Sequence, residues 1–217
     1  MRPFRGLARA AALLLLTAGA AAADPPPGTL EGLMAGMARA SGVLAEFREV
    51  KTLALLAAPL ESRGVLHFVP PDRMVRRTLE PAPSALVVDG RRVVFHDGSG
   101  EAPVDLSGDP SARQFVDHFT TLFRGDLAAL REKYEVRFLA EPPGWRLVLQ
   151  PRDAVLRRFV ASLTLSGEGE TLREMVLVER DGDRTMTQFG RVETDYVYTA
   201  EELAALFGTG EAGARTP

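Results

Sequence analysis

The chain contains no cysteine among its 217 residues, and only three histidines. Without cysteine there is no disulfide framework, no thiolate nucleophile and no thiolate metal ligand. His67, His96 and His118 lie too far apart in sequence to form an H-x-H or H-x-x-x-H metal motif. The G-S-G run at 98–100 is not a hydrolase elbow, because no strand-turn-helix pattern surrounds it. We therefore expect no catalytic residues, no metal and no cofactor.

Long hydrophobic runs are also scarce, and the first one lies in an N-terminal leader. A basic start containing Arg2 and Arg5 precedes a short apolar run at 10–16, and Ala21-Ala22-Ala23 stands before Asp24. This pattern is typical of a cleaved secretory signal peptide, and the apolar run is too short to favour a membrane span. No cysteine follows it, which excludes acylation as a lipoprotein. We expect residues 1–23 to be removed and the protein to reside in the periplasm.

The remaining chain has no excess of positive charge. The leader removes three arginines, which leaves 23 basic against 29 acidic residues, a net charge of −6. This balance argues against nucleic acid as a partner and against a generally basic surface for membrane docking. The length suits one domain with its own core. We expect this domain to span residues 24–208, with 209–217 as a loose tail.

Helix signals occur at three places in the sequence. Thr29 precedes an apolar stripe at 30–37 with i, i+3, i+4, i+7 spacing, and Gly42 is the expected end of this helix. Asp109-Pro110 predicts a second helix that ends at Gly125, followed by one or two turns at 126–133. Thr199 and Glu202 form a capping box for a short last helix that ends at Gly208.

Strand signals fill most of the rest. Residues 44–56 predict a first strand, and residues 60–95 contain four extended runs separated by the corners Pro70-Pro71, 81–83 and Asp89-Gly90. In the second half, apolar and polar residues alternate. The predicted strands there cover residues 134–138, 145–150, 159–165, 173–180 and 184–192, with Asp181-Gly182-Asp183 as a hairpin turn.

About ten strands and only two substantial helices predict an α+β fold built on one antiparallel sheet. The apolar face of such a sheet needs a second layer, and two helices are too few to cover ten strands by close packing. We therefore expect a strongly curved sheet that forms an unclosed β-barrel, with helices as a lid over an apolar cavity. Such a cavity could hold a lipid chain.

The order of several short motifs resembles the periplasmic outer-membrane lipoprotein carriers of the LolA type, as a divergent member. The motifs are Phe47, Pro59-Leu60, Gly64-Val65-Leu66, Pro70-Pro71-Asp72, Glu80-Pro81, the run at 86–90, Pro143-Gly144-Trp145, Leu147, Leu149-Gln150-Pro151 and Asp181-Gly182. The resemblance spans nearly the whole mature chain. It implies an unclosed barrel of about eleven strands and a monomeric, non-enzymatic carrier. The cargo would be acylated lipoproteins, received from an inner-membrane releasing complex and delivered to an outer-membrane acceptor.

The residues expected to contact lipid are apolar positions of the strands and of the second helix. The cavity candidates are Phe47, Leu66, Phe68, Trp145, Leu147, Phe159 and Leu163, and the lid candidates are Phe115, Phe119 and Phe123. Each of these side chains is equally suited to an ordinary packed core, and the sequence does not separate lining from packing.

One position departs from the pattern of the family. Carriers of this type usually place an arginine just before the proline of the first corner, where it helps to hold the lid closed, and here that position is Pro70. Arg73, Arg76 or Arg77 could replace it, although a solvated strand face is the simpler interpretation of these arginines.

Two other functions remain open at this stage. The same fold could carry another cargo, such as a free lipid, a glycolipid or a polyene-type product. A periplasmic hydrolase acting on lipids would be a different class of protein. It would need a nucleophile and a base inside the cavity, and no serine, histidine and acid stand in a recognisable arrangement.

Overall fold

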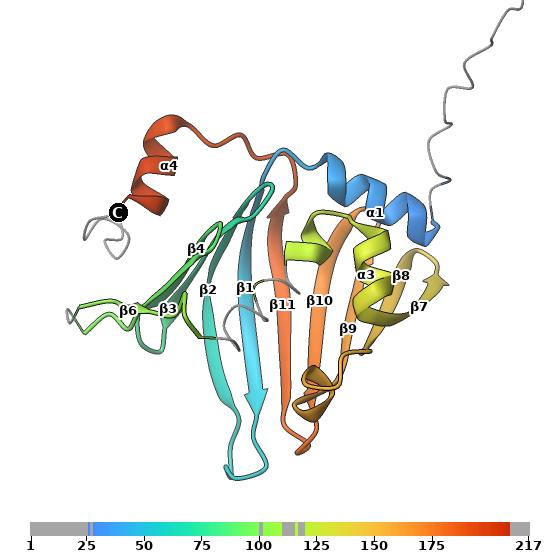
Figure 1. Ribbon diagram of the computed structural model, residues 1–217, viewed down its shortest axis with the longest axis horizontal. Coiled ribbons are helices and arrows are strands. Elements are labelled where there is room, and N and C mark those ends of the chain that lie inside the picture. Colours follow the sequence, from blue (N-terminus) through green and yellow to red (C-terminus); the bar gives the residue numbers. More distant parts are fainter. Residues whose placement is uncertain (1–25, 27, 100–101, 110–115, 117–119, 209–217) are drawn as a thin grey trace, which may run out of the picture.

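Eleven strands form one antiparallel sheet in the computed structural model of the protein, which describes residues 26, 28–99, 102–109, 116 and 120–208. The strands are β1 (Val43–Thr52), β2 (Leu60–Val69), β3 (Arg73–Glu80), β4 (Ser84–Asp89), β5 (Arg92–His96), β6 (Val104–Asp105), β7 (Tyr134–Glu141), β8 (Gly144–Pro151), β9 (Val160–Glu168), β10 (Thr171–Glu179) and β11 (Arg184–Glu193). Within the described residues the outermost strands, β6 and β7, do not pair, so the sheet curves without closing (Figure 1). The expected α+β class and unclosed sheet are confirmed.

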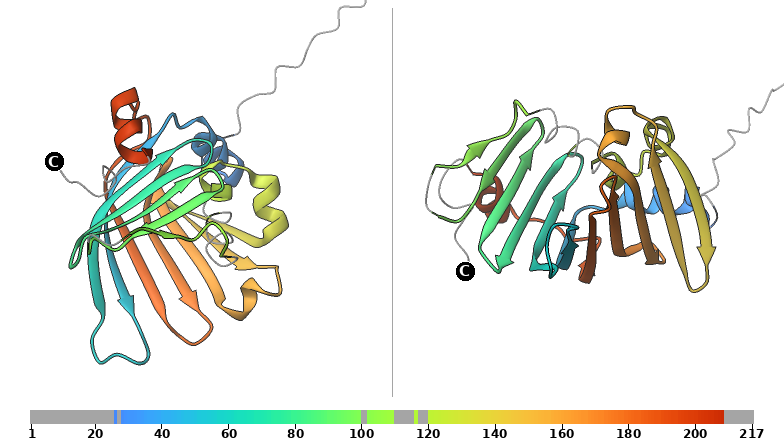
Figure 2. Two further views of the ribbon diagram at one scale, coloured as in Figure 1. Left: turned by 60° about the vertical axis from the view of Figure 1, so that its left-hand side comes forward. Right: turned by 90° about the horizontal axis from the view of Figure 1, so that it is seen from below.

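The sheet consists of two meanders joined at its centre. Its strand order is β6-β5-β4-β3-β2-β1-β11-β10-β9-β8-β7, so the first and last strands of the chain are neighbours. Their pairing runs from Leu44 opposite Glu193 to Thr52 opposite Arg184. Because β6 and β7 lie at opposite edges, the chain between them must pass from one edge of the sheet to the other. Its described residues 120–133, called the crossing segment here, lie against the curved sheet (Figure 2).

Three helices have the ends that their capping residues predict, with one small difference. Helix α1 (Leu30–Arg39) begins at Thr29, whose hydroxyl accepts a hydrogen bond from Gly32 N, but it ends at Ala40 rather than at Gly42. Helix α3 (Leu127–Lys133) is capped by Asp126, and α4 (Ala200–Phe207) has the predicted capping box. None of the helices in the described ranges combines the length and the apolar character needed to cross a membrane.

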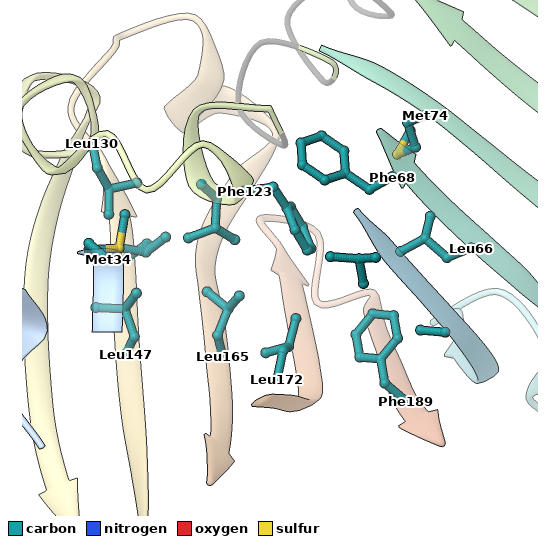
Figure 3. Packing of buried hydrophobic residues seen from close by; sticks show 14 of the residues in the cluster. Met34, Leu66, Phe68, Met74, Phe123, Leu130, Leu147, Leu165, Leu172 and Phe189 are labelled. Carbon is teal, nitrogen blue, oxygen red and sulfur yellow. The ribbon is translucent and has the colours of Figure 1, made fainter. Parts of the chain in front are cut away.

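One face of the sheet, called the inner face here, carries the main core. Its side chains pack against α1, α3, Val116 and residues 120–123, and those labelled in Figure 3 point toward one another from the sheet and the helices. The largest side chains that are fully buried in this core are Phe68, Met34, Met74, Leu122, Leu130, Leu147, Leu149 and Leu165. The strands therefore provide one layer, and α1 with Val116 and residues 120–133 provides the other, called the lid layer here.

Helix α4 is not part of this lid layer. Leu206 and Phe207 pack on Val75, whose neighbour Met74 belongs to the main core. Since successive side chains of a strand alternate between faces, α4 covers the opposite, outer face of β3 and β4. Figure 1 shows α4 well separated from α1.

Two strand predictions need correction, and one strand was not predicted. The first strand ends at Thr52, and residues 53–59 form a loop instead of continuing to 56. The edge strand β6 has only two residues, which is too short for an alternation signal. Phe159 lies outside β9: it follows the short helical turn η1 (Leu156–Arg158) with φ −108° and ψ −43°, so its side chain leaves the inner face and is 62% exposed.

Candidate functional site

A hollow of about 330 Å³ lies between α1 and the centre of the sheet. Its apolar wall comes from helix α1, strands β1, β10 and β11, and the segment that crosses the inner face. The lining residues are Gly36, Met37, Arg39, Ala40, Val43, Phe123, Glu170, Leu172, Val192, Thr194 and Asp195. This volume falls within the range of pockets that hold small ligands, about 300–1,000 Å³.

The mouth of this hollow is bridged by an ion pair. Arg39 Nη2 of α1 lies 2.9 Å from Glu170 Oε1 of the β9–β10 turn, and both side chains are more than half exposed. Gly36 permits this approach, because a Cβ at that position would collide with the carboxylate of Glu170. An exposed pair of this kind contributes only about 0–1 kcal/mol. Breaking this pair therefore costs little free energy.

A β-bulge brings one wall residue into the hollow. Arg191 has φ +39°, a conformation that L-residues rarely adopt, and the register between β1 and β11 shifts at this point. The extra residue reverses the alternation of β11, so Val192 packs against the main core on the inner face.

The sequence-predicted cavity residues are mostly found deeper in the core. Phe47, Leu66, Phe68, Trp145 and Leu147 are each at most 5% exposed and belong to one cluster. Leu163 is half-buried and packs against that cluster. Their contact with a lipid stays a prediction, because none of them is among the residues that line the hollow.

The lid candidates divide in a similar way. Phe123 lines the hollow, and its ring lies 5.3 Å from the ring of Phe68, measured between centroids. Phe115 and Phe119 lie outside the described residues. The corrected position of Phe159 makes it the one predicted cavity residue found on the surface.

Most residues that form the wall of the hollow were not predicted from the sequence. Met37 was recognised only as part of a helical stripe, and Val43, Leu172 and Val192 lie near strand ends where alternation gives little information. The bulge at Arg191 has no sequence signal that we could have used. Small residues on a helix face, such as Gly36 and Ala40, are the signal that comes nearest to marking the site.

The first corner is held by an arginine from the crossing segment. Arg124 Nε donates a hydrogen bond of 2.7 Å to Pro71 O, and Arg124 Nη2 lies 3.5 Å from Asp72 Oδ2. Arg124 directly follows Phe123, so this contact fixes the lid segment to the turn between β2 and β3.

The three arginines considered as substitutes have other contacts. Arg73 pairs with Asp89 and stacks on Phe207 of α4. Arg76 points along the inner face, where its guanidinium lies 4.2 Å from the ring centre of Phe47 and 3.0 Å from Glu49. With Thr187, which donates to Glu49, this pair ends the apolar part of the inner face.

Arg77, the third, is directed to the outer face. Burial lowers the pKa of its guanidinium, and within the described residues its Nε has no hydrogen-bond partner. In the described residues, the contact between the first corner and the segment after Phe123 is thus made by Arg124 and not by these three arginines.

The two described histidines are placed away from the hollow. His67 and His96 have registers that put them on the outer face, opposite Val75 and Ala85 respectively. Burial, followed by the charge of Arg77, lowers the pKa of His67 to about 4, so it is neutral at pH 7. His118 lies outside the description. Across the described ranges no group of three or more potential metal ligands comes together.

A second, larger hollow has a different character. It has a volume of about 860 Å³ and is lined by the ion pairs Arg48–Glu61 and Arg63–Glu80, by the predicted cavity residue Phe47 and by residues 188–190. Alternation directs most of these charged side chains to the outer face. Charged side chains and the apolar residues Phe47, Pro81 and Phe189 therefore line this hollow together.

Comparisons with known proteins agree with this architecture. A model of the family "outer membrane lipoprotein carrier protein LolA-like" matches residues 21–208. No curated protein matches the sequence.

Among solved structures, a DUF1329 family protein from Desulfovibrio piger is 10% identical, with a TM-score of 0.50, and the match covers 84% of this chain and 95% of that one. A LolA superfamily protein from Nitrosomonas europaea is 11% identical with a TM-score of 0.44, covering 81% and 96%. The complex of MucA and MucB from Pseudomonas aeruginosa gives 18% identity and a TM-score of 0.48, covering 81% of this chain and 59% of that one. At such identities a likeness indicates the fold alone.

Proposed function

Because the chain belongs to the LolA-like family of outer membrane lipoprotein carrier proteins, we propose that it carries acylated lipoproteins across the periplasm. The observation that supports this most directly is the apolar hollow under α1, closed by surface contacts. The family consists of carrier and binding proteins. The specific cargo, the export of the chain and its partners are part of the proposal.

The energetics of an acyl chain set the requirement that such a carrier must meet. Removing one methylene from water contributes about 0.8 kcal/mol, so a sixteen-carbon chain contributes on the order of 12 kcal/mol. A soluble carrier has to offset most of this by burial and still release the chain. The hollow offers Met37, Val43, Phe123 and Leu172 as an apolar wall that is already formed.

The lid supplies the second property, which is reversible opening. Within the described residues, the exposed polar contacts of the lid layer include Arg39–Glu170, Arg131–Glu31, Arg124–Asp72 and Arg124 Nε to Pro71 O. Each is worth little on its own. Behind Phe123 lies the packed core around Phe68, so outward movement of the crossing segment would extend the hollow along the inner face.

For this role the protein would reside in the periplasm, after cleavage of its signal peptide near Ala23. An inner-membrane complex would then load the carrier, and an outer-membrane acceptor would unload it. These steps are the expected role of a member of this family, with the protein acting as a monomer.

Purification from its own periplasm tests the proposal. The protein, tagged at its C-terminus, should co-purify with diacyl- or triacyl-modified peptides that mass spectrometry detects after extraction. Recovery of only free lipid, glycolipid or polyene, under conditions that retain lipoprotein complexes, would assign the fold to another cargo.

A matched pair of variants tests the location of the site. Ala40→Trp directs an indole into the hollow, whereas Ala128→Trp places one on the exposed side of α3. We expect Ala40→Trp to weaken binding of a synthetic diacylated cysteine peptide at least tenfold and Ala128→Trp to leave it unchanged. Equal binding by both folded variants would exclude this hollow.

A further inference from the structure

The loop between β1 and β2 exposes leucines at the end of the sheet that α1 and α4 leave bare. Leu55 is 98% exposed, and Leu56 and Leu60 are 46% and 52% exposed. No charged residue occurs from Thr52 through Leu60. Figures 1 and 2 show this hairpin projecting beyond the neighbouring turns, on the far side of the molecule from α1 and α4.

Two other turns join this loop to form a continuous rim. Ala54 N donates a hydrogen bond of 2.8 Å to Asp183 Oδ1 in the β10–β11 turn. Next to it, Arg180 N donates to Phe159 O at 2.8 Å, which connects that turn to the segment between β8 and β9. That segment exposes Val155 by 54% and Phe159 by 62%. We call Leu55, Leu56, Leu60, Val155 and Phe159 the apolar rim.

The charges around the apolar rim differ from those of the whole protein. The basic residues are Lys51, Arg152, Arg157, Arg158, Arg180 and Arg184, and the acidic residues are Glu61, Asp153, Glu179, Asp181 and Asp183. Six of these residues are basic and five are acidic, and Lys51 lies 3.8 Å from Glu179, in a mature chain with a net charge of −6.

Two of these carboxylates accept hydrogen bonds from backbone N–H groups within their own turns. Asp153 Oδ1 accepts hydrogen bonds from Val155 N and Leu156 N, and Asp181 Oδ1 accepts one from Asp183 N. Arg157 and Arg158 are exposed, directly beside Phe159. An anionic surface that approaches this end meets guanidinium groups next to apolar side chains.

From this arrangement we propose that the apolar rim docks the protein on the surface of an anionic lipid bilayer. The rim is convex and built from three turn segments, which suits shallow insertion between headgroups rather than the grip of a peptide or helix in a groove. A second copy of the chain would have to meet it with an equally convex tip and would bury little area. Arginines near the surface add attraction to anionic lipids.

The docking surface is separate from the hollow under α1, so it does not depend on the nature of the cargo. It places the bare end of the sheet on the membrane and directs α1 and α4 away from it. Loading and release would then take place with the protein held at the bilayer.

Vesicle flotation tests the proposal with the full mature chain. Vesicles of phosphatidylcholine and phosphatidylglycerol should carry the wild-type protein upward in a density gradient. The double substitution Leu55→Glu and Leu56→Glu should reduce the floated fraction at least tenfold. Val197→Glu is the matched control, because Val197 is 78% exposed but lies beyond the opposite end of the sheet. Failure of the wild type to float, or equal flotation of tip variant and control, would overturn the proposal.

Two further measurements separate lipid docking from other causes. Replacing Arg157 and Arg158 by serine should lower flotation with anionic vesicles and leave it unchanged with pure phosphatidylcholine. Sedimentation velocity should give the same monomer mass for the wild type and the tip variant, whereas a dimer lost in the variant would assign the rim to self-association. The tip variant should still bind the diacylated peptide, so failure of docking and failure of the carrier proposal are distinguishable.

Discussion

Apolar side chains are buried at one end of the sheet and exposed at the other. At the end covered by α1, Phe68, Leu147 and their neighbours are almost completely removed from water, and exposed ion pairs close the surface. At the bare end, Leu55 and Phe159 project into solvent. One chain thus has one place where apolar surface is enclosed and another where it is presented.

This difference matches two tasks that the proposed carrier would have to combine. Enclosure requires burial on several sides and a layer that can move, which α1 and the crossing segment provide. Presentation requires side chains that are exposed on rigid turns, which the hydrogen bonds of Ala54 and Arg180 provide.

Truncation of one apolar residue at each end gives the largest expected contrast. Phe68→Ala, in the enclosed core, should lower the free energy of unfolding by about 3–5 kcal/mol, because it leaves a cavity. Leu55→Ala, at the exposed tip, should change it by less than about 0.5 kcal/mol. Urea unfolding followed by circular dichroism measures both. Similar losses at the two sites would mean that the tip is packed in solution.

The contact of Arg124 with the first corner tests how the enclosed end is closed. Arg124→Ala removes the hydrogen bond to Pro71 O and the pairing with Asp72, each partly exposed, so we expect a loss of about 1 kcal/mol in lid closure. Amide hydrogen exchange at residues 120–125 should then become about fivefold faster.

Arg146→Ala is the matched control for this experiment. It removes the Arg146–Glu141 pair, which is exposed to a similar degree but lies on the β7–β8 hairpin. Exchange at residues 120–125 should be the same as in the wild type. An equal acceleration in the control and in Arg124→Ala would show that the latch has no specific effect.

The pH dependence of stability gives the smallest effect. His67 contacts Tyr198 under α4, with Arg77 and Glu202 as the charged groups that act on it, and its folded pKa is about 4 against an ordinary value of 6.5. Between these pH values the unfolded chain binds more protons, so stability should fall as the pH decreases from 6.5 to 4 and level off below.

Substitution of the histidine isolates this contribution. His67→Gln should have a flatter stability profile than the wild type between pH 6.5 and 4, and the same slope above pH 6.5. A shift from 6.5 to 4 would contribute about 3 kcal/mol in full. Because solvent screens the partly exposed ring, we expect the measured difference to be no more than about 1 kcal/mol. Equilibrium urea titrations at several pH values measure it, and parallel profiles would contradict it.

Much of the fold could be predicted because local signals and tertiary structure agree. The runs at 60–69 and 73–80 correspond to β2 and β3, since each has corners that strongly favour a turn. The capping residues Thr29 and Thr199 marked their helices correctly. The place of α4 on the outer face could not be predicted, because a capping box fixes where a helix begins and not which layer it joins.

The candidate site could be predicted less well from the sequence than the fold. Alternation correctly placed Trp145 and Leu147 on the inner face, but a buried core residue and a pocket-lining residue have the same pattern. The hollow depends on long-range features, namely the bulge at Arg191 and the fit of Gly36 against Glu170. The exposed leucines near Leu55 look like a continuation of the strand in the sequence, and only the fold shows that they extend beyond it.

The pairing of β1 with β11, called the seam here, has a consequence for the order of folding. Each meander can form from neighbouring hairpins, but Leu44 meets Glu193 only after nearly the whole chain is present, and such distant pairings form slowly. Val43 and Val192, on either side of this seam, are both walls of the hollow. The hollow therefore forms only when this long-range pairing between the two halves of the chain has been made.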